Sequence, residues 1–315
     1  MKNSSRKRKE RLALFLALIP LLGFVVFNGL PLIISIIGLF FNVDLYDIGN
    51  IQWNNFEGFK SVFVEGHGFD LFGFDVGKYF YKSFGITMWI ASTQLLTLGI
   101  ALVMAVLLER KLRGTSLFRV LFFVPYICSS VSVGLMWKWV FAYEGGILNS
   151  IFGTNIEFLQ DPNWMTWCII IAVIWQAPGY GIVMYKAAFS NVNQSLYEAA
   201  SLDGAGEWAQ FRHITLPSIA PTTFYLMMAG VTAGVLTYDI AALVIEDVWG
   251  TLGGVDSMGL TLMRLVYYLI TNGTTTDANG VSYMVSCASV ISWILFIITG
   301  TLSMILFRMR ERSME

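Results

Sequence analysis

The chain has 315 residues, of which 56% are hydrophobic and only 13% are charged, and its mean hydropathy is +0.65. Soluble domains carry roughly 25% charged residues, so this composition excludes an ordinary soluble domain and indicates a protein surrounded largely by lipid. The formal net charge of −1 gives no positive field for nucleic acid. Cys128, Cys168 and Cys287 lie in apolar runs without the spacing of a zinc site or a disulfide framework, and we interpret them as packing residues.

Six apolar stretches approach or exceed the length of about 20 residues that a helix needs to cross a bilayer. They are residues 12–41, 84–108, 120–137, 165–185, 219–245 and 281–307. The first is too long for the apolar part of a signal peptide, so we expect a retained helix, kinked near Pro20 and Pro31. The sequence therefore predicts an all-α membrane protein with six transmembrane helices.

Basic residues predict the orientation of these helices. Lysine and arginine are concentrated in the N-terminal tail, in the connection after the second stretch and in the C-terminal tail, whereas the alternate loops are acidic. Because cytoplasmic flanks carry the excess of basic residues, we expect both termini to be cytoplasmic. The expected parts are a basic tail (1–11), a first helix with an extracytoplasmic loop (12–82), a five-helix core (83–307) containing a cytoplasmic loop (186–218), and a second tail (308–315).

The loop at 186–218 is unusually structured for a connection between membrane helices. Ser195 and Glu198 match the capping box, which predicts a helix beginning near Leu196. Asp203 is followed by Gly204, which can adopt the left-handed conformation that ends a helix.

A second short helix is expected in this loop from about Glu207, closed by Pro217 because the residue before a proline avoids helical angles. The residues alone allow two interpretations of the pair. It either covers the ends of the bundle or provides a docking segment for a partner.

The segment YEAASLDGAGEWAQFRHITLPSIAP, residues 197–221, resembles the EAA motif of inner-membrane permeases of binding-protein-dependent ABC importers. The segments FEGFKSVF, LRGTSLFRVLFFVPYICSSVSVGLMWKWVFAYEGGILNSIF and TYDIAALVI extend the resemblance, which is to the carbohydrate-uptake branch with maltose- and glycerol-phosphate-type permeases. Where that branch commonly has Gly-Gly-Pro, this chain has Gly253-Gly254-Val255.

The resemblance implies a type I ABC importer permease fold in a bacterial or archaeal cell membrane. It also implies that the first short helix is a coupling helix that docks on an ATPase through Glu198, Ala199, Ala200, Asp203 and Gly204. The implied partners are a second homologous permease, a cytoplasmic ABC ATPase dimer, an extracytoplasmic solute-binding protein, membrane lipid and a sugar substrate.

Motifs for chemistry are absent from the sequence. There is no G-x-x-x-x-G-K-[ST] phosphate loop, no H-E-x-x-H and no G-x-S-x-G. We therefore expect a permease subunit that is not an enzyme and holds no cofactor or metal, with Mg-ATP bound by the partner ATPase.

Asp239 is the carboxylate deepest in a predicted span, and such residues usually face a bundle interior or an aqueous cavity. With Thr237 and Tyr238 beside it, Asp239 is a candidate hydroxyl acceptor on a sugar path. The alternatives are an acid paired with a neighbouring helix and an acid hydrated near the outer face.

The segment IWQAPGYG places Pro178 and two glycines inside the fourth span, where they should break or bend the helix. Freed carbonyl groups together with Trp175, Gln176 and Tyr180 are the second set of substrate-path candidates. Packing alone is the alternative role for these side chains.

Three other functions stay open from the sequence. An ABC permease for another small solute shares the EAA pattern. A secondary transporter would use Asp239 as a proton or cation site, and a scaffolding membrane protein would need no cavity.

Overall fold

The computed structural model describes residues 2–42, 51–64, 75–109, 115–247, 251–271 and 283–314. The described part is helical apart from loops and one antiparallel pair of two-residue strands, which confirms the all-α class. The chain divides into two compact units, unit 1 (Met1–Gly77 and Val266–Ser292) and unit 2 (Lys78–Leu265 and Trp293–Glu315). Residues 43–50, 65–74 and 110–114, which carry part of the charge pattern that predicts the orientation, lie outside the described residues.

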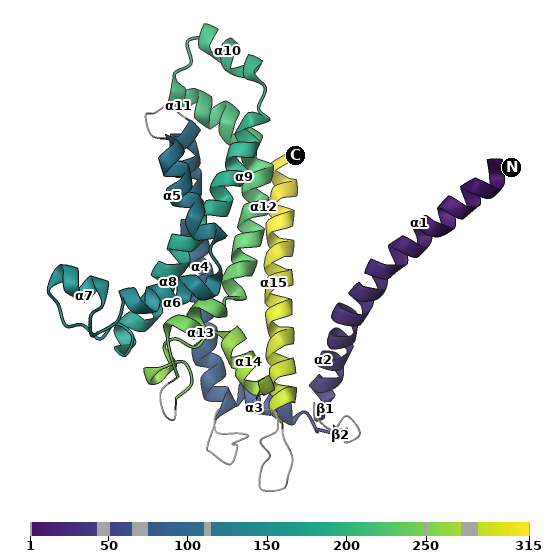
Figure 1. Cartoon of the computed structure of the whole chain (residues 1–315), viewed down its shortest axis with the longest axis vertical. Helices are drawn as coiled ribbons and strands as arrows, with labels where there is room; N and C mark the ends of the chain where they lie inside the picture. The colour runs from purple at the N-terminus through teal and green to yellow at the C-terminus, as the bar shows by residue number, and fades with distance from the viewer. Residues whose placement is uncertain are drawn as a thin grey trace. The chain divides into compact units, whose positions relative to one another are not determined.

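The elements follow in chain order in Figure 1. The first group is α1 (Lys2–Phe24), the π-helical segment η1 (Val25–Gly29), α2 (Leu30–Phe40), β1 (Phe41–Asn42), β2 (Gln52–Trp53) and α3 (Glu57–Phe63). The second group is α4 (Val76–Glu109), α5 (Thr115–Ile127), α6 (Ser130–Val140), α7 (Ile147–Phe152), α8 (Pro162–Gln176) and α9 (Pro178–Ser190). The third group is α10 (Gln194–Leu202), α11 (Glu207–Gln210), the π-helical segment η2 (Phe211–Thr215), α12 (Leu216–Val235), α13 (Asp239–Val244), the 3-10 turn η3 (Val255–Ser257), α14 (Leu262–Thr271) and α15 (Met284–Met314).

Five helical stretches are long and apolar enough to cross a membrane, and a bent pair brings the number to six if it forms one span, among the described residues. The bent pair is Val120–Ile127 with Ser130–Val140, at an angle of 109°. The third predicted span is therefore not the straight helix that its composition indicates. Pro125 lies inside α5, and Ser129 has extended backbone angles that end the helix there.

The first span bends between its two prolines, as predicted. Pro20 lies inside α1 and Pro31 lies in the first turn of α2, and the chain between them forms the wide π turn Val25–Gly29. A π turn is a common site of helix bending, and Figure 1 shows the curve at this position.

Asn54 organises the non-helical part of unit 1. Its side-chain nitrogen donates to Ser286 Oγ at 2.7 Å, and its side-chain oxygen accepts the Phe56 N–H at 3.0 Å. A Cβ atom on Gly58 would lie 2.1 Å from Ser286 Oγ, so α3 and the start of α15 approach more closely than any side chain would allow. The FEGFKSVF segment thus forms a short helix fixed by buried polar contacts.

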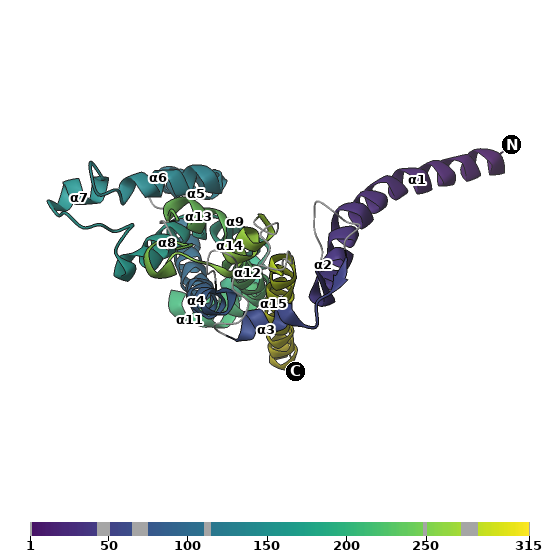
Figure 2. The ribbon, with the colours of Figure 1, turned by 90° about the horizontal axis from the view of Figure 1, so that it is seen from below.

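Among the described residues, unit 2 contains two clusters of buried hydrophobic side chains. One cluster joins α4, α6, α8 and α13, and the other joins α4, α9 and α12. Figure 2 shows α6 beside α13 when the molecule is seen from below. Many large apolar side chains along the spans remain exposed, as expected for surfaces that contact lipid rather than water.

Arg264 fixes the loop that follows α13. It is 5% exposed, its Nη2 atom lies 2.6 Å from Asp247 Oδ1, and its Nη1 atom donates to the carbonyl groups of Ala241 and Gly259 at 3.1 and 3.3 Å. Burial lowers the pKa of the guanidinium, and the neighbouring Asp247 carboxylate opposes that change. The same carboxylate oxygen accepts the Gly253 N–H at 2.7 Å, so one charged pair holds both sides of the loop.

We predict that Arg264→Met lowers the free energy of unfolding by about 2 kcal/mol, because two buried carbonyl groups lose their donors. Thermal unfolding of the detergent-solubilised protein measures this change. Lys138→Met is the matched control, since Lys138 pairs with Glu246 at an exposed position where such pairs contribute about 0–1 kcal/mol. Equal stability of the two variants would contradict the structural role of Arg264.

Candidate functional site

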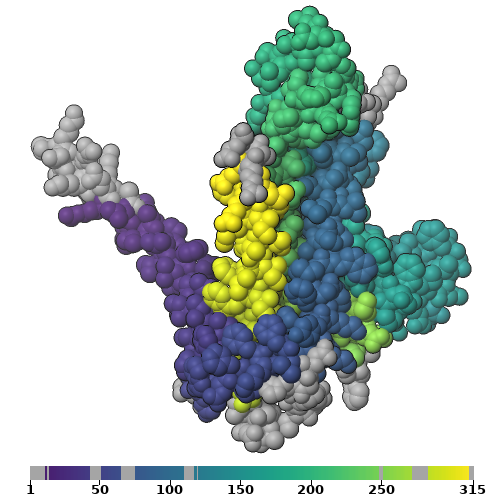
Figure 3. All heavy atoms as spheres, turned by 180° about the vertical axis from the view of Figure 1, so that it is seen from behind, coloured from purple at the N-terminus to yellow at the C-terminus, as the bar shows by residue number. Residues whose placement is uncertain are grey.

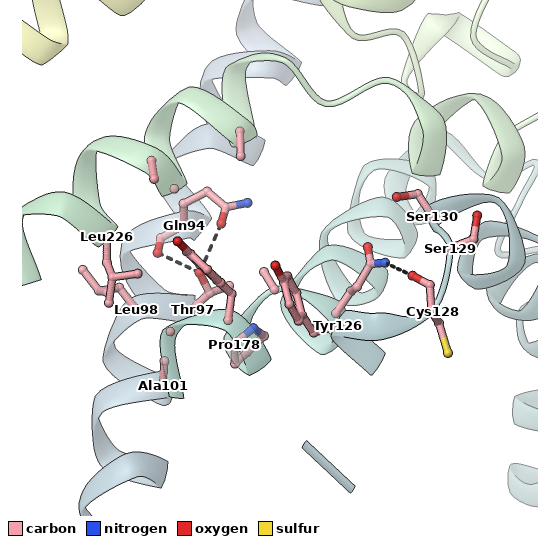
Figure 4. A pocket seen from close by; sticks show the side chains of 17 residues that line it. Gln94, Thr97, Leu98, Ala101, Tyr126, Cys128, Ser129, Ser130, Pro178 and Leu226 are labelled. Carbon is pink, nitrogen blue, oxygen red and sulfur yellow. Dashed lines mark hydrogen bonds between the residues drawn. The ribbon is translucent and has the colours of Figure 1, made fainter. Parts of the chain in front are cut away.

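A cavity of about 500 Å³ lies within unit 2, between α4, α5, α6, α8, α9 and α12. One interruption of the membrane helices, at Cys128 and Ser129, opens onto it, and Ala177 and Pro178 of the span Pro162–Ser190 line it. Irregular backbone at membrane depth is tolerated where it is buried in protein or lines a cavity. Figure 4 shows side chains from both sides of the break at Cys128 facing this space.

Two of the predicted path residues, Gln176 and Tyr180, line the cavity. Gln176 Nε2 donates to the carbonyl oxygen of Cys128 at 3.2 Å and so satisfies a group freed by the break. The Tyr180 hydroxyl lies 3.1 Å from the Tyr225 hydroxyl, and its ring lies 5.5 Å from the ring of Tyr126 at an angle of 31°. An amide and a pair of aromatic rings are therefore held in fixed positions.

Glycines allow the helices around the cavity to meet closely. A Cβ atom on Gly179 would lie 2.6 Å from Tyr126 Cβ, and one on Gly181 would lie 2.7 Å from Ala101 Cβ. The break expected at IWQAPGYG is not seen, because Ala177 keeps helical angles and Pro162–Ser190 forms one span. Its glycines bring α9 against α5 and α4.

The sequence patterns missed two polar residues of α4 that line the cavity, Gln94 and Thr97. Gln94 is 7% exposed, and the Thr97 hydroxyl lies 3.2 Å from its side-chain oxygen and 2.8 Å from its main-chain oxygen. The i, i+3 spacing of two polar residues on an uncharged apolar helix was the available signal.

Trp175, Thr237 and Tyr238 do not line this cavity in the described structure. Trp175 packs edge-on against Trp137 at 5.9 Å. The Thr237 hydroxyl donates to the Ala233 carbonyl at 3.2 Å, and the Thr237 carbonyl accepts from Thr261 Oγ1 at 2.8 Å. Tyr238 is half-buried at the break before α13.

Asp239 is not deep within a continuous helix, contrary to the expectation from the sequence. α12 ends at Val235, and Asp239 is the exposed first residue of α13. A carboxylate in the first turn of a helix interacts favourably with the free N–H groups there. The structure thus gives Asp239 a local role at a helix start and places it outside the cavity lining.

The sequence interpretation of the three cysteines as packing residues that face lipid or the bundle agrees with Cys168 and Cys287, which are each 1% exposed. Cys128 is exposed and lines the cavity. The sequence did not indicate this exposure, because the residues around Cys128 in PYICSS continue an apolar span. The break at Cys128 is accompanied by a hydrogen bond from Gln176 of α8, which is distant in sequence.

The second site is α10, an exposed helix that projects with α11 from one end of unit 2 (Figure 3). Its N-cap is Asn193, whose side-chain oxygen accepts the Ser195 N–H at 3.1 Å, and the helix begins at Gln194. The predicted capping box at Ser195 and Glu198 is therefore wrong, because Asn193 already fills the cap and Ser195 lies inside the helix.

The predicted end of this helix is confirmed. Gly204 has a φ of +81°, its N–H donates to the Ser201 carbonyl at 3.1 Å, and the Ala205 N–H donates to the Ala200 carbonyl at 2.9 Å. This pair of bonds is the Schellman arrangement, which needs a left-handed residue after the helix. Glu198, Ala199, Asp203 and Gly204 are exposed, and Ala200 is half-buried.

The second short helix does not end at Pro217. α11 continues through η2 into α12, and the Leu216 N–H donates to the Phe211 carbonyl across a π turn. Pro217 follows the π turn directly, so the helix bond that its missing N–H cannot make falls beside this wider turn. The base of α12 is also tied to α10, because the Tyr197 hydroxyl lies 2.8 Å from Thr215 Oγ1.

Residues 97–315 match the family described as "Binding-protein-dependent transport system inner membrane component". The chain belongs to this family. It is therefore a multi-pass membrane permease subunit, and the match covers the cavity helices from Thr97 onward together with α10.

Individual relatives of this permease extend the likeness to the whole chain. "Probable ABC transporter permease protein YesP" of Bacillus subtilis is 27% identical over 98% of this chain and 93% of its own length. "Lactose transport system permease protein LacF" of Rhizobium radiobacter is 32% identical over 68% of this chain and 70% of its own length. The "sn-glycerol-3-phosphate transport system permease protein UgpA" of Agrobacterium fabrum is 32% identical over 43% of this chain and 47% of its own length.

Solved structures share the fold of this permease. A chain of a bacterial ABC transporter involved in the import of the acidic polysaccharide alginate matches with a TM-score of 0.78 and 18% identity, covering 99% of both chains. A chain of the alginate transporter in complex with an alginate pentasaccharide-bound periplasmic protein matches with a TM-score of 0.77 and 18% identity, covering 98% of this chain and 96% of that chain. These likenesses confirm the expected ABC importer permease fold.

We predict that a water-soluble maleimide modifies Cys128 in the folded permease, while Cys168 and Cys287 react only after unfolding, because Cys128 alone of the three is exposed. Mass spectrometry of peptides from the native and denatured protein measures the labelling. Cys128→Ser should remove the native labelling. Labelling of either buried cysteine at the same rate as Cys128 would contradict the described packing.

Proposed function

We propose that this permease translocates a sugar or oligosaccharide as one subunit of an ATP-driven importer. The observation that carries this proposal is the cavity at the helix break, which combines aromatic rings with amide and hydroxyl groups. Such a lining suits a solute with apolar faces and many hydroxyl groups. The name of the lactose relative supports the same class of solute.

The proposed assembly contains a second homologous permease, a cytoplasmic ABC ATPase dimer that binds Mg-ATP, and an extracytoplasmic solute-binding protein. The family description and the periplasmic protein in the alginate complex support the binding-protein partner. We place the assembly in a bacterial or archaeal cell membrane with both termini in the cytoplasm. In unit 2, Arg310 near the end of α15 lies over the ring of Phe224 in α12. This contact supports placing the C-terminus and the loop at 186–218 on the same side of the membrane.

The proposed coupling segment is α10. Glu198 and Asp203 are exposed and available to basic groups of the ATPase, and Ala199 and Ala200 permit close approach. Gln210 Nε2 donates to Ser201 Oγ at 2.9 Å and to the Ala205 carbonyl at 3.0 Å, so α10 and α11 are bound to each other. Movement of α10 with the ATPase would thereby be passed to α12, which lines the cavity, and would drive alternating access.

A secondary transporter that uses Asp239 lacks support from the cavity, because Asp239 does not line it among the described residues. An ABC permease for another small solute is the alternative that solute screening decides.

Isolation of the tagged permease from its native membrane tests the assembly. We expect mass spectrometry to identify a second permease, an ABC ATPase and a solute-binding protein. Recovery of the intact, folded chain without an ATPase would count against the proposal.

We predict that Glu198→Lys lowers solute uptake at least about tenfold, which corresponds to 1.4 kcal/mol of coupling. The folding and the thermal stability of the isolated permease should remain unchanged. Gly204→Asp should act in the same direction. Nothing lies within 4 Å of the Cβ position of Gly204, but the left-handed conformation costs a residue with a side chain about 1–2 kcal/mol. ATP-dependent uptake by vesicles containing the whole complex measures the effect.

The matched control is Glu144→Lys, which makes the same charge change at an exposed residue between α6 and α7. We expect this variant to transport normally. Equal uptake by Glu198→Lys and the control would show that α10 is not the coupling segment.

A further inference from the structure

The cavity in unit 2 has an uncharged lining. None of the 17 described residues that line it is Asp, Glu, Lys, Arg or His (Figure 4). A second hollow of about 380 Å³ in the same unit is bordered by Lys138, Glu157, Glu246 and Asp247. Charged residues are therefore present in unit 2, but they lie at a different hollow.

Two amides, Gln94 buried and Gln176 half-buried, give the cavity hydrogen-bonding groups of opposite kinds. The side-chain oxygen of Gln94 lies beside the Thr97 hydroxyl, which leaves the Gln94 amino group without a partner among the described residues. Gln176 uses its amino group on the Cys128 carbonyl, which leaves its side-chain oxygen as the acceptor. Gln94 thus offers a donor and Gln176 an acceptor, and a sugar hydroxyl can pair with either.

The aromatic part of the lining is fixed in place. The rings of Tyr126 and Tyr180 lie 5.5 Å apart, and the hydrogen bond from Tyr180 to Tyr225 holds one of them at its outer end. Rings held in this way provide an apolar surface without loss of side-chain freedom on binding.

We propose that this cavity takes an uncharged sugar unit and rejects uronic acids and sugar phosphates. The proposal rests on the proposed carbohydrate transport and names the class of solute within it. A carboxylate or phosphate in this space would lose its hydration without gaining a cation, and burial of an unpaired charge is strongly unfavourable. Sites for such anions normally supply arginine or lysine.

The proposed class of solute differs from that of one of the transporters whose fold this permease shares. The alginate transporter imports an acidic polysaccharide. The cavity of this chain indicates a different class of solute despite the common fold.

The test measures protection of Cys128, which lines the cavity and is exposed. The whole complex isolated with the permease is treated with N-ethylmaleimide in the presence of neutral glucose and galactose trisaccharides of α- and β-linkage, or of trigalacturonate. We expect at least one neutral trisaccharide to slow labelling of Cys128 and trigalacturonate to leave the rate unchanged.

The outcomes separate this inference from the proposed function. Protection by trigalacturonate that equals or exceeds that by every neutral sugar overturns the uncharged assignment and leaves a carbohydrate site. Protection by none of the sugars overturns carbohydrate binding itself and, with it, this inference.

A charge variant provides a second measurement. Gln176→Arg adds a cation to the lining, so we expect protection by the neutral sugar to weaken about tenfold, which is 1.4 kcal/mol, and trigalacturonate to begin to protect. Gln160→Arg, an exposed position outside the cavity, adds the same charge and should change neither response. Identical behaviour of the two variants would overturn the proposal. If Gln176→Arg does not fold, the comparison of neutral trisaccharides with trigalacturonate on the wild-type complex decides alone.

Discussion

Backbone polar groups at membrane depth need partners within the protein, and the arrangement of unit 2 depends on this constraint. Membrane helices break at Cys128 and at residues 236–238. The Cys128 carbonyl is satisfied by Gln176, and the Thr237 carbonyl by Thr261. Both breaks are therefore closed by a side chain from another element, and the first leaves a cavity beside the closing group.

The charges of unit 2 are kept away from this cavity. Arg264 and Asp247 pair beside the loop after α13, Lys138 pairs with Glu246, and Lys186 lies 3.5 Å from Glu109 near the other end of the helices. This distribution follows from the cost of an unpaired charge in an apolar bundle. It also means that the proposed site offers a solute hydrogen bonds and shape rather than charge, and that the charged groups fix loops and helix ends.

Composition and local pattern predicted the apolar spans, the helical class and the left-handed end of α10 at Gly204. They did not predict details that depend on a single contact. Asn193 and Ser195 are both good caps, and one hydrogen bond decides between them. Pro217 usually ends a helix, but a π turn carries the chain past it. Cys128 and Arg264 became recognisable only through a shared cavity or through partners distant in sequence.

The π turn at Phe211–Thr215 links the number of residues in the loop to the orientation of α10. A π turn holds one residue more than an α-helical path between the same points, and each residue turns a helix by about 100°. Deleting one residue there would convert the segment to a regular helix that joins the same points, so α11 and α12 would keep their orientation. Deleting one residue from α11 or from the start of α12 would instead rotate α10 about the α12 axis by roughly that angle. Phe211–Thr215 is thus the segment where the loss of one residue leaves the direction of the exposed face of α10 unchanged.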